Sequence, residues 1–281
     1  MAFVSFRRAD GTASYGRIEG DRILDYGAAA GAPADLKAAI AAGTLARLDH
    51  HGELALADVT LLPVIPNPGK ILCVGHNYES HRQETGRAKV DHPSIFTRFA
   101  DTLVADGQPI MLPTVSSHLD FEGELAIVIG RGGRHITETD ALDHIAGYAC
   151  FNDASLRDWQ WHTTQFIPGK NFPRTGAFGP ALVTPDEAGE LADVHVVTSL
   201  NGDVVQDQPI RDMIFPIPKI IAYVSAFTPL SSGDVIATGT PGGVGAKREP
   251  PLWMKAGDRV GVAIGPIGTL TNEIENERQT G

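Results

Sequence analysis

The stretch "HLDFEGELAIVIG", residues 118–130, limits the folds available to this chain more than any other. From its phenylalanine onward every second position suits a hydrophobic core, which predicts a β-strand, and Gly123 is the only gap on that face. The other face begins with Glu122 and Glu124, whose Cβ atoms would stand roughly 7 Å apart, twice the rise per residue. Small apolar residues continue this second face, so the two carboxylates are expected in the interior, where an unpaired charge is unfavourable. The fold must therefore supply a compensating charge.

The composition predicts a soluble globular protein that binds neither nucleic acid nor membrane. Hydrophobic residues make up 42% of the 281 and charged residues 20%, which are ordinary globular proportions. The net charge of −11 includes no block of like charge, which disfavours nucleic acid and anionic lipid as partners. We find neither an apolar signal core nor a run near the ~18 apolar residues that cross a bilayer. Cys73 and Cys150 lie in apolar segments and predict buried thiols in a reducing cytoplasm.

The chain is predicted to contain two modules, with a boundary near residue 66. Residues 1–66 contain short alternating strands with Asp-Gly and Gly-Asp turns, and a helix near residues 33–48. A proline-rich segment, "LLPVIPNPGK", leads into residues 67–281, where short strands outnumber helices. Helices do not alternate regularly with these strands, so a doubly wound sheet or a TIM barrel fits poorly. We expect an α+β fold: a mixed, strand-rich catalytic domain with a small N-terminal β-rich module.

A third acid, Asp153, follows the apolar strand in "YACFNDASLRDWQ". Together with Glu122 and Glu124 it forms an all-oxygen ligand set, which suits Mg²⁺, Mn²⁺ or Ca²⁺ and disfavours zinc or copper. Mg²⁺ is the first choice, because three protein ligands leave positions for a chelating substrate. Two structural explanations stay open. Asp153 would be a helix N-cap, with Ser155 and Asp158 as a second capping pair, or the two glutamates would be a solvated strand face.

Two further polar groups are predicted on helices. Asp153, Arg157 and Gln160 have the spacing i, i+4 and i+7, and would form a stripe that receives an anionic ligand or an ordinary surface ion pair. His81 and Glu84, at i and i+3 of a short helix in "VGHNYESHRQETGR", can touch. A carboxylate that orients an imidazole makes a general base near neutral pH, although such pairs are also common surface features.

Two loops carry the remaining candidates. Lys170 lies in "FIPGKNFPRTGAFGP", where proline and glycine turns could fix its ammonium group. The segment "TGTPGGVG", residues 238–245, fits neither the dinucleotide nor the phosphate-loop pattern. It is predicted to be either a tight turn or a loop whose backbone amides and Thr240 hydroxyl hold an anionic group.

The motifs "NYESHRQE", "DFEGELAIVIG", "FNDASLRDWQ", "GKNF" and "TGTPGGVG" occur in this order, and the chain resembles the fumarylacetoacetate hydrolase family over roughly residues 66–275. The shorter bacterial members look most similar: acylpyruvate hydrolases, oxaloacetate decarboxylases and 2-oxo-hepta-3-ene-1,7-dioate isomerases or hydratases. The resemblance implies a β-roll catalytic domain and a homodimer. It also implies a divalent cation, commonly Mg²⁺, held by Glu122, Glu124 and Asp153.

The resemblance implies roles for other residues of this sequence as well. His81 and Glu84 match the family's catalytic dyad, and Lys170 matches its active-site lysine. Positions near the substrate are matched by Arg157, Gln160 and Thr240. Arg98, in "FTRF", is also expected at the substrate, but it stands where many members have lysine. Since arginine and lysine contact carboxylates differently, the identity of the substrate is not carried over.

The predicted activity is metal-dependent hydrolysis of a C–C bond in a 2,4-dioxo acid of the acylpyruvate type. The substrate would chelate the cation, so that the carbanion left by cleavage is stabilised as an enolate. His81, backed by Glu84, would deprotonate the attacking water, while Lys170 and Arg157 stabilise the oxyanion and the substrate carboxylate. The same chemistry serves decarboxylation of an oxaloacetate-like acid, or isomerisation or hydration of an unsaturated 2-oxo-dioate.

Two other classes of protein fit parts of the pattern. A glycosidase also uses paired carboxylates, but aromatic residues, which form sugar platforms, make up only 7% of the chain. A non-catalytic protein could hold a structural cation and bind a small acid in its cleft. Sensitivity to a chelator separates the first alternative, and turnover of acylpyruvates separates the second.

Overall fold

The computed structural model describes residues 1–45 and 50–278, and its largest element is a twelve-stranded mixed sheet. The strands lie side by side in this order: β4 (Glu53–Ala55), β3 (Arg22–Asp25), β2 (Ala13–Glu19), β1 (Ala2–Arg7), β14 (Gly176–Val183), β12 (Ile145–Asn152), β11 (Gly123–Ile129), β17 (Val235–Ala237), β6 (Ile71–Gly75) and β7 (Ser94–Arg98). Beside this path, β5 (Thr60–Leu61) pairs with β1 and β8 (Leu103–Val104) pairs with β14.

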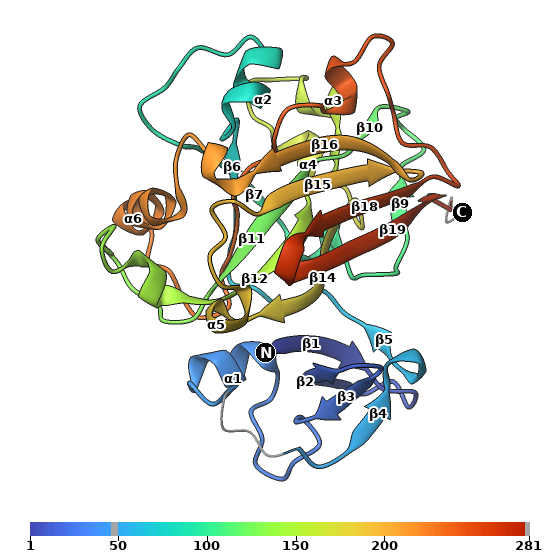
Figure 1. The fold of residues 1–281 in the computed structure, drawn as a ribbon. Helices are drawn as coiled ribbons and strands as arrows, with labels where there is room; N and C mark the ends of the chain where they lie inside the picture. The colour runs from blue at the N-terminus through green and yellow to red at the C-terminus, as the bar shows by residue number, and fades with distance from the viewer. Residues whose placement is uncertain (46–49, 279–281) are drawn as a thin grey trace.

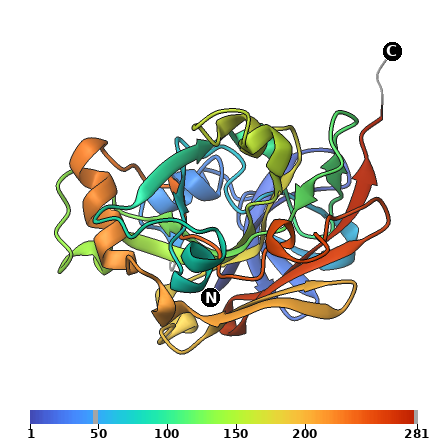
Figure 2. The ribbon, with the colours of Figure 1, turned by 90° about the horizontal axis from the view of Figure 1, so that it is seen from above.

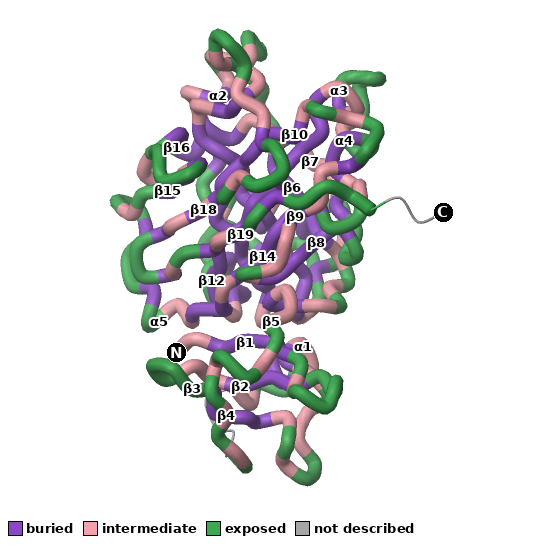
Figure 3. Tube along the Cα trace, turned by 90° about the vertical axis from the view of Figure 1, so that its right-hand side faces the viewer, coloured by how far each residue is buried: buried purple, intermediate pink, exposed green. Residues whose placement is uncertain are grey.

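A second, five-stranded sheet packs against β11, β12 and β14 of the first. Its strands lie in this order: β16 (Asp203–Pro209), β15 (His195–Leu200), β18 (Arg259–Ile264), β19 (Gly268–Asn276) and β9 (Ile110–Leu112). A short third pair joins β10 (Leu119–Asp120) to β13 (Ser155–Leu156). In Figure 3 most of the strands are buried, and the exposed residues lie largely in the connecting loops.

Short helices connect the strands without a regular alternation. They are α1 (Leu36–Ala41), α2 (Glu79–Glu84), α3 (Arg157–Gln160), α4 (Ile167–Lys170), α5 (Pro185–Ala188) and α6 (Ile217–Phe227). The expectation of an α+β fold is therefore confirmed. In the part of the chain that the structure describes, no helix is long and apolar enough to cross a membrane.

The N-terminal strands and α1 form a small module, which lies below the rest of the molecule in Figure 1. Its sheet continues into the larger part, because β1 pairs with β14 at Ala2–Val183 and Phe3–Leu182. The helix predicted near residues 33–48 begins after Asp35, whose carboxylate accepts the Ala38 N–H at 2.7 Å. It ends at Ala41, and the last part of that prediction falls on residues outside those described. The module boundary near residue 66 stays a prediction.

Strand β11 is buried on both faces, as its sequence predicts. One face packs in the main core through Leu125, Ile127 and Ile129, and the other packs in a second core through Ala126 and Val128. The gap at Gly123 also has a physical reason. A Cβ atom there would lie 2.0 Å from Oγ1 of Thr198 on β15, so only glycine allows the two sheets to approach this closely.

The pairing of β11 with β12 brings the site together. Gly123 lies opposite Asn152, which puts Glu122 and Glu124 beside Asp153. The backbone N–H of Asp153 donates to the carbonyl of Glu122 at 2.9 Å. In Figure 2, which looks down from above, α2 and the α3–α4 segment lie on the side of the molecule that faces the reader.

Candidate active site

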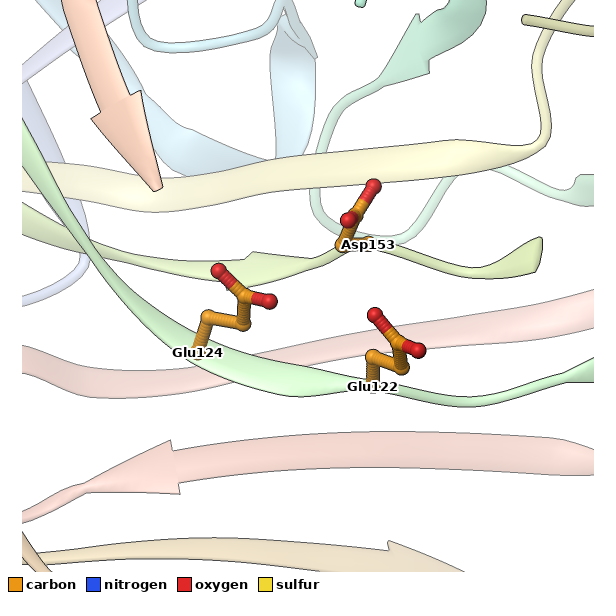
Figure 4. A group of neighbouring side chains, drawn as sticks. All are labelled: Glu122, Glu124 and Asp153. Atoms are coloured by element: carbon orange, nitrogen blue, oxygen red, sulfur yellow. The ribbon is translucent and has the colours of Figure 1, made fainter. Parts of the chain in front are cut away.

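Three acidic side chains meet where β11 and β12 pair. One carboxylate oxygen from each of Glu122, Glu124 and Asp153 lies within 4.8 Å of the others, and all three residues are buried. Figure 4 shows Glu122 and Glu124 rising from the same strand toward the neighbouring segment that carries Asp153. This burial rules out a solvated strand face. Asp153 does not cap a helix either, because α3 begins at Arg157 with Leu156 in the N-cap position.

Three cations pair with Glu122 and Asp153. The guanidinium of Arg157 lies 2.6 Å from Oε1 of Glu122, and Nζ of Lys170 donates to Oε2 of the same residue at 2.7 Å. Lys170 also donates to Oδ2 of Asp153 at 2.6 Å, and Arg98 donates to its Oδ1 at 2.6 Å. Both carboxylate oxygens of Glu122 and of Asp153 are therefore paired with cations. The protein itself thus supplies part of the compensating charge that the sequence requires.

These ion pairs set the charge of the cluster. Burial alone would raise the pKa of Glu122, but the charges of Arg157 and Lys170 outweigh it and hold that pKa below its ordinary value. Burial would likewise lower the pKa of Lys170, but Asp153 and Glu122 outweigh it and raise that pKa. The lysine thus stays charged inside the protein.

Glu124 has a different environment. Its Oε2 accepts the Gly239 N–H at 2.8 Å, and within residues 1–45 and 50–278 no cationic side chain forms an ion pair with it. Burial, and then the charges of Asp153 and Glu122, raise the pKa of Glu124 well above its ordinary value. A divalent cation would balance this negative charge, and the oxygen donors suit a hard ion. The residues present therefore fit the metal site that the sequence predicts.

The predicted contact between His81 and Glu84 is present. Nδ1 of His81 lies 2.7 Å from Oε1 of Glu84, and Oε2 of Glu84 accepts the Gly243 N–H at 2.9 Å. His81 is only 5% exposed and lines the same cavity as Glu122 and Glu124. Because Nδ1 is engaged, Nε2 is the ring nitrogen available to a substrate.

The cavity has a volume of about 120 Å³. Most of the predicted site residues line it: His81, Glu122, Glu124, Arg157, Gln160, Lys170 and Thr240. Glu84 and Asp153 contact these lining residues from behind. A second cavity of about 360 Å³ adjoins the first and shares Gly75, His76, Arg87 and Phe166 with it. The first cavity thus offers charged groups on several sides of a small acid.

The glycine-rich segment at residues 238–245 binds the protein's own carboxylates. The acceptors are Glu84, Glu124 and Asp120. The donors are the backbone N–H groups of Gly239, Gly243 and Gly245, and of Ala246 directly after the segment. The backbone amides of this loop therefore hold anionic groups, as one of the two interpretations predicts. These groups are carboxylates of the protein itself, however, and not a bound ligand. The Thr240 hydroxyl donates to the carbonyl of Gly123 at 2.9 Å.

The helical stripe predicted for Asp153, Arg157 and Gln160 is wrong in its local structure. Helix α3 contains only Arg157–Gln160, and Asp153 precedes the short strand β13. Arg157 donates to Oε1 of Gln160 and, through Nε, to Oδ2 of Asp120, each at 2.8 Å. The pairing of β13 with β10 overrides the local helical spacing, although Arg157 and Gln160 still reach the cavity.

Arg98 lies elsewhere than expected from the family resemblance. Its guanidinium is fully buried behind Asp153 and is not part of the cavity lining. Besides Asp153, it donates to the carbonyl of Ala154 at 2.9 Å and to the hydroxyls of Thr175 at 3.0 Å and Thr102 at 3.2 Å. Every contact is internal, so the position supports a structural role that holds Asp153 in place rather than contact with a substrate.

Replacing Arg98 should therefore reduce stability. Arg98→Met leaves one oxygen of the buried Asp153 carboxylate unpaired, and we expect a loss of about 3 kcal/mol in the free energy of unfolding, measured with urea. Arg98→Lys is the matched control, because it keeps the charge and loses only some of the hydrogen bonds, for an expected loss of about 1 kcal/mol. Equal stability of Arg98→Met and the parent protein would contradict this role.

Sequence reasoning missed two residues that support the site. Asp120 is fully buried between Arg157 and the amides of the glycine-rich segment. The sequence does contain a signal for Asp120, because this residue extends the alternation of acidic positions that Glu122 and Glu124 form. Gln206 accepts the Gly123 N–H at 3.0 Å and donates to the Thr240 hydroxyl at 2.8 Å. It lies on β16, and nothing in its local sequence marks it.

Comparisons with known proteins agree with this geometry. The family model "Fumarylacetoacetate (FAA) hydrolase C-terminal" matches residues 70–275. An oxaloacetate tautomerase of Bacillus subtilis, YisK, is 42% identical over 224 residues, 78% of this chain and 74% of that protein. A mitochondrial oxaloacetate tautomerase of Xenopus laevis is 41% identical over 223 residues, 79% of this chain and 70% of that protein.

A solved structure extends the similarity over nearly the whole chain. A fumarylacetoacetate hydrolase from Exiguobacterium antarcticum is 35% identical and superposes with a TM-score of 0.87, covering 99% of this chain and 100% of that one. The N-terminal module is therefore part of the shared fold. The matched family region contains all three carboxylates and both members of the His81–Glu84 pair. This chain belongs to the fumarylacetoacetate hydrolase family of enzymes.

Proposed function

We propose that the chain is a divalent-cation-dependent enzyme that interconverts the enol and keto forms of oxaloacetate or a closely related 2-oxo diacid. One observation carries the proposal: an imidazole–carboxylate pair and a cluster of three buried carboxylates meet at one cavity of about 120 Å³. A small acid can present its 2-oxo group to a cation held by the three carboxylates and its transferable proton to the imidazole. The relatives described as oxaloacetate tautomerases support this choice of substrate.

Glu122, Glu124 and Asp153 would hold the cation, which we propose to be Mg²⁺, with Mn²⁺ or Ca²⁺ as alternatives. When bound, the cation supplies Lewis-acid polarisation of the 2-oxo oxygen and the adjacent carboxylate. Lys170 and Arg157 line the same cavity as fixed positive charges. They favour the binding of a dianionic acid in a site that is otherwise rich in carboxylates.

His81 performs the proton transfer. Its Nε2 accepts the hydroxyl proton of the enol, and a proton then passes from His81 to C3 of the same molecule, so the net reaction is an isomerisation. Glu84 orients the ring through Nδ1 and stabilises the imidazolium between the two steps. A positioned acid–base group of this kind contributes about 10²–10⁴-fold.

Hydrolysis of an acylpyruvate is the second candidate, and the His81–Glu84 contact favours it, because an imidazole held by a carboxylate also activates water. His81 would take a proton from water as the oxygen adds to the C4 carbonyl. The C3–C4 bond then breaks, its electron pair stays with C3, and protonation of C3 gives pyruvate and a second carboxylic acid. Decarboxylation of oxaloacetate and isomerisation of an unsaturated 2-oxo-dioate would use the same groups.

A substrate panel with and without Mg²⁺ tests the proposal. We expect the ultraviolet absorbance of enol-oxaloacetate to decay fastest with enzyme and Mg²⁺ together, without release of pyruvate. An enzymatic rate no greater than that of Mg²⁺ alone would contradict the tautomerase proposal. Pyruvate from a 2,4-dioxo acid would favour the hydrolase, and pyruvate from oxaloacetate the decarboxylase. A protein that binds these acids and turns over none would be a binding protein.

A further inference from the structure

His76 adopts a backbone conformation that is uncommon for a residue with a side chain. It directly follows β6, and its φ of 55° lies in the left-handed region. The fully buried Asn77 holds this turn. Its amide donates to the carbonyl of Thr238 at 2.7 Å and of Phe215 at 3.1 Å, and its Oδ1 accepts the Phe215 N–H at 2.8 Å. Conformations of this kind persist where the surroundings determine them, and they cluster at functional sites.

This conformation places the imidazole of His76 against the face of His81. The two ring centroids are 5.1 Å apart and the ring planes differ by 12°, which is a stacked arrangement. His76 also meets Phe166 at 6.0 Å and 61°, and Phe166 meets Phe96 at 5.6 Å and 76°. Nζ of Lys170 lies 5.0 Å from the centre of the Phe96 ring. A continuous row of rings therefore connects His81 with the buried lysine.

The stack restrains a motion that Glu84 leaves free. The Glu84 carboxylate holds one atom of the His81 ring, Nδ1, and a ring held at one atom can still tilt about that contact. A second ring against its face fixes the plane and therefore the direction of Nε2. Direction matters because a displacement of about 1 Å in a reacting group can reduce the rate by about 10²-fold.

We propose that His76 is a positioning residue, which stacks on His81 and holds its Nε2 toward the bound acid. The inference rests on the proposed function, in which His81 transfers the proton. It assigns His76 no contact with the reacting atoms.

His76 is not suited to act as a second base. Burial, and then the neighbouring His81 and Arg87, lower the pKa of His76 to about 4, so the ring is neutral near neutral pH. The other charged groups that face it are Glu122 and Lys170. A neutral ring can lie against His81 without repelling the imidazolium that forms during proton transfer.

Two substitutions of His76 separate stacking from other roles. Asparagine tolerates the left-handed conformation and removes the ring, whereas phenylalanine keeps an aromatic face and removes the ring nitrogens. We expect His76→Asn to lower kcat by about 10- to 100-fold with KM and bound metal unchanged. His76→Phe should regain most of the lost kcat. His195→Asn is the control, because it makes the same replacement at a surface histidine, which pairs with Asp207, and it should change nothing.

NMR spectra of the His81 ring give a readout that does not depend on turnover. The ring current of His76 acts on the His81 ring protons, so His76→Asn should shift their signals, and His76→Phe should leave them closer to their original positions. Thermal denaturation establishes whether each variant is folded. If His76→Phe is not folded, the kinetics and the NMR spectra of His76→Asn decide.

Three results would overturn the positioning role: full kcat in His76→Asn, an equal loss of kcat in folded His76→Phe, or an effect confined to KM. If the parent protein itself turns over none of the panel, the proposed function fails on its own account. The spectra then still test the stack, since unchanged His81 signals in His76→Asn would exclude it.

Discussion

Glu124→Gln should abolish both cation binding and turnover while leaving the protein folded. Glutamine keeps the size of the side chain and can still accept the Gly239 N–H, but it removes the negative charge that the cation would balance. Lewis-acid stabilisation is worth several kcal/mol, so we expect kcat to fall by at least about 10³-fold. The metal-free variant should be at least as stable as the parent protein, because a neutral amide avoids the cost of burying a carboxylate and its repulsion from Asp153 and Glu122.

Calorimetric titration with Mn²⁺ or Mg²⁺ and a urea melt measure the two effects separately. Glu273→Gln, at an exposed glutamate of β19, is the matched control and should behave like the parent protein. The double variant Glu122→Gln with Glu124→Gln should also lack cation binding and activity. It should be less stable, since Arg157 and Lys170 lose a charged partner. Activity of either variant in chelator-treated buffer would exclude the proposed metal site.

His81→Ala should lower kcat by about 10²–10⁴-fold, because it removes the only group placed to move the substrate proton in the proposed mechanism. Cation affinity should not change, since His81 donates no ligand to the three-carboxylate cluster. Glu84→Gln should have a smaller effect, because the amide still occupies the position beside Nδ1 but no longer stabilises an imidazolium.

Steady-state kinetics with enol-oxaloacetate, together with a metal titration of each variant, measure these effects. Unchanged turnover of His81→Ala with the cation bound would remove the dyad from the mechanism. A parallel loss of cation binding would instead mean that the substitution disturbed the carboxylate cluster, and the kinetic result would then not support proton transfer by His81.

Local patterns in the sequence predicted those parts of the fold that depend on neighbouring residues. The alternation around Glu122 and Glu124 identified β11 and its two buried faces, because side chains of a strand alternate whatever lies beside it. The contact of His81 with Glu84 also follows from spacing on one helix. The sequence also pointed to Asp153 as a third ligand, but its meeting with the two glutamates depends on the register of β11 with β12, which local patterns do not give.

Features that depend on distant segments were not predictable from local patterns. Arg98 was expected at the substrate, but the packing of its strand behind Asp153 turns the guanidinium inward. Arg157 was placed on a helix with Asp153, but it pairs with Asp120 and Glu122 because β13 joins β10. The orientation of a long side chain depends on which partners surround it, and those partners come from elsewhere in the chain.

The glycine-rich segment has a consequence for how this enzyme can change. Its amides hold Glu84 beside His81, the proposed general base, Glu124 in the carboxylate cluster and Asp120 behind Arg157. A deletion or a bulky replacement anywhere in that short loop would misalign proton transfer, ion coordination and anion attraction simultaneously. Evolution toward a new substrate should therefore proceed through residues that line the second cavity alone, such as Ala88, Lys89 and Val90, which make none of these hydrogen bonds.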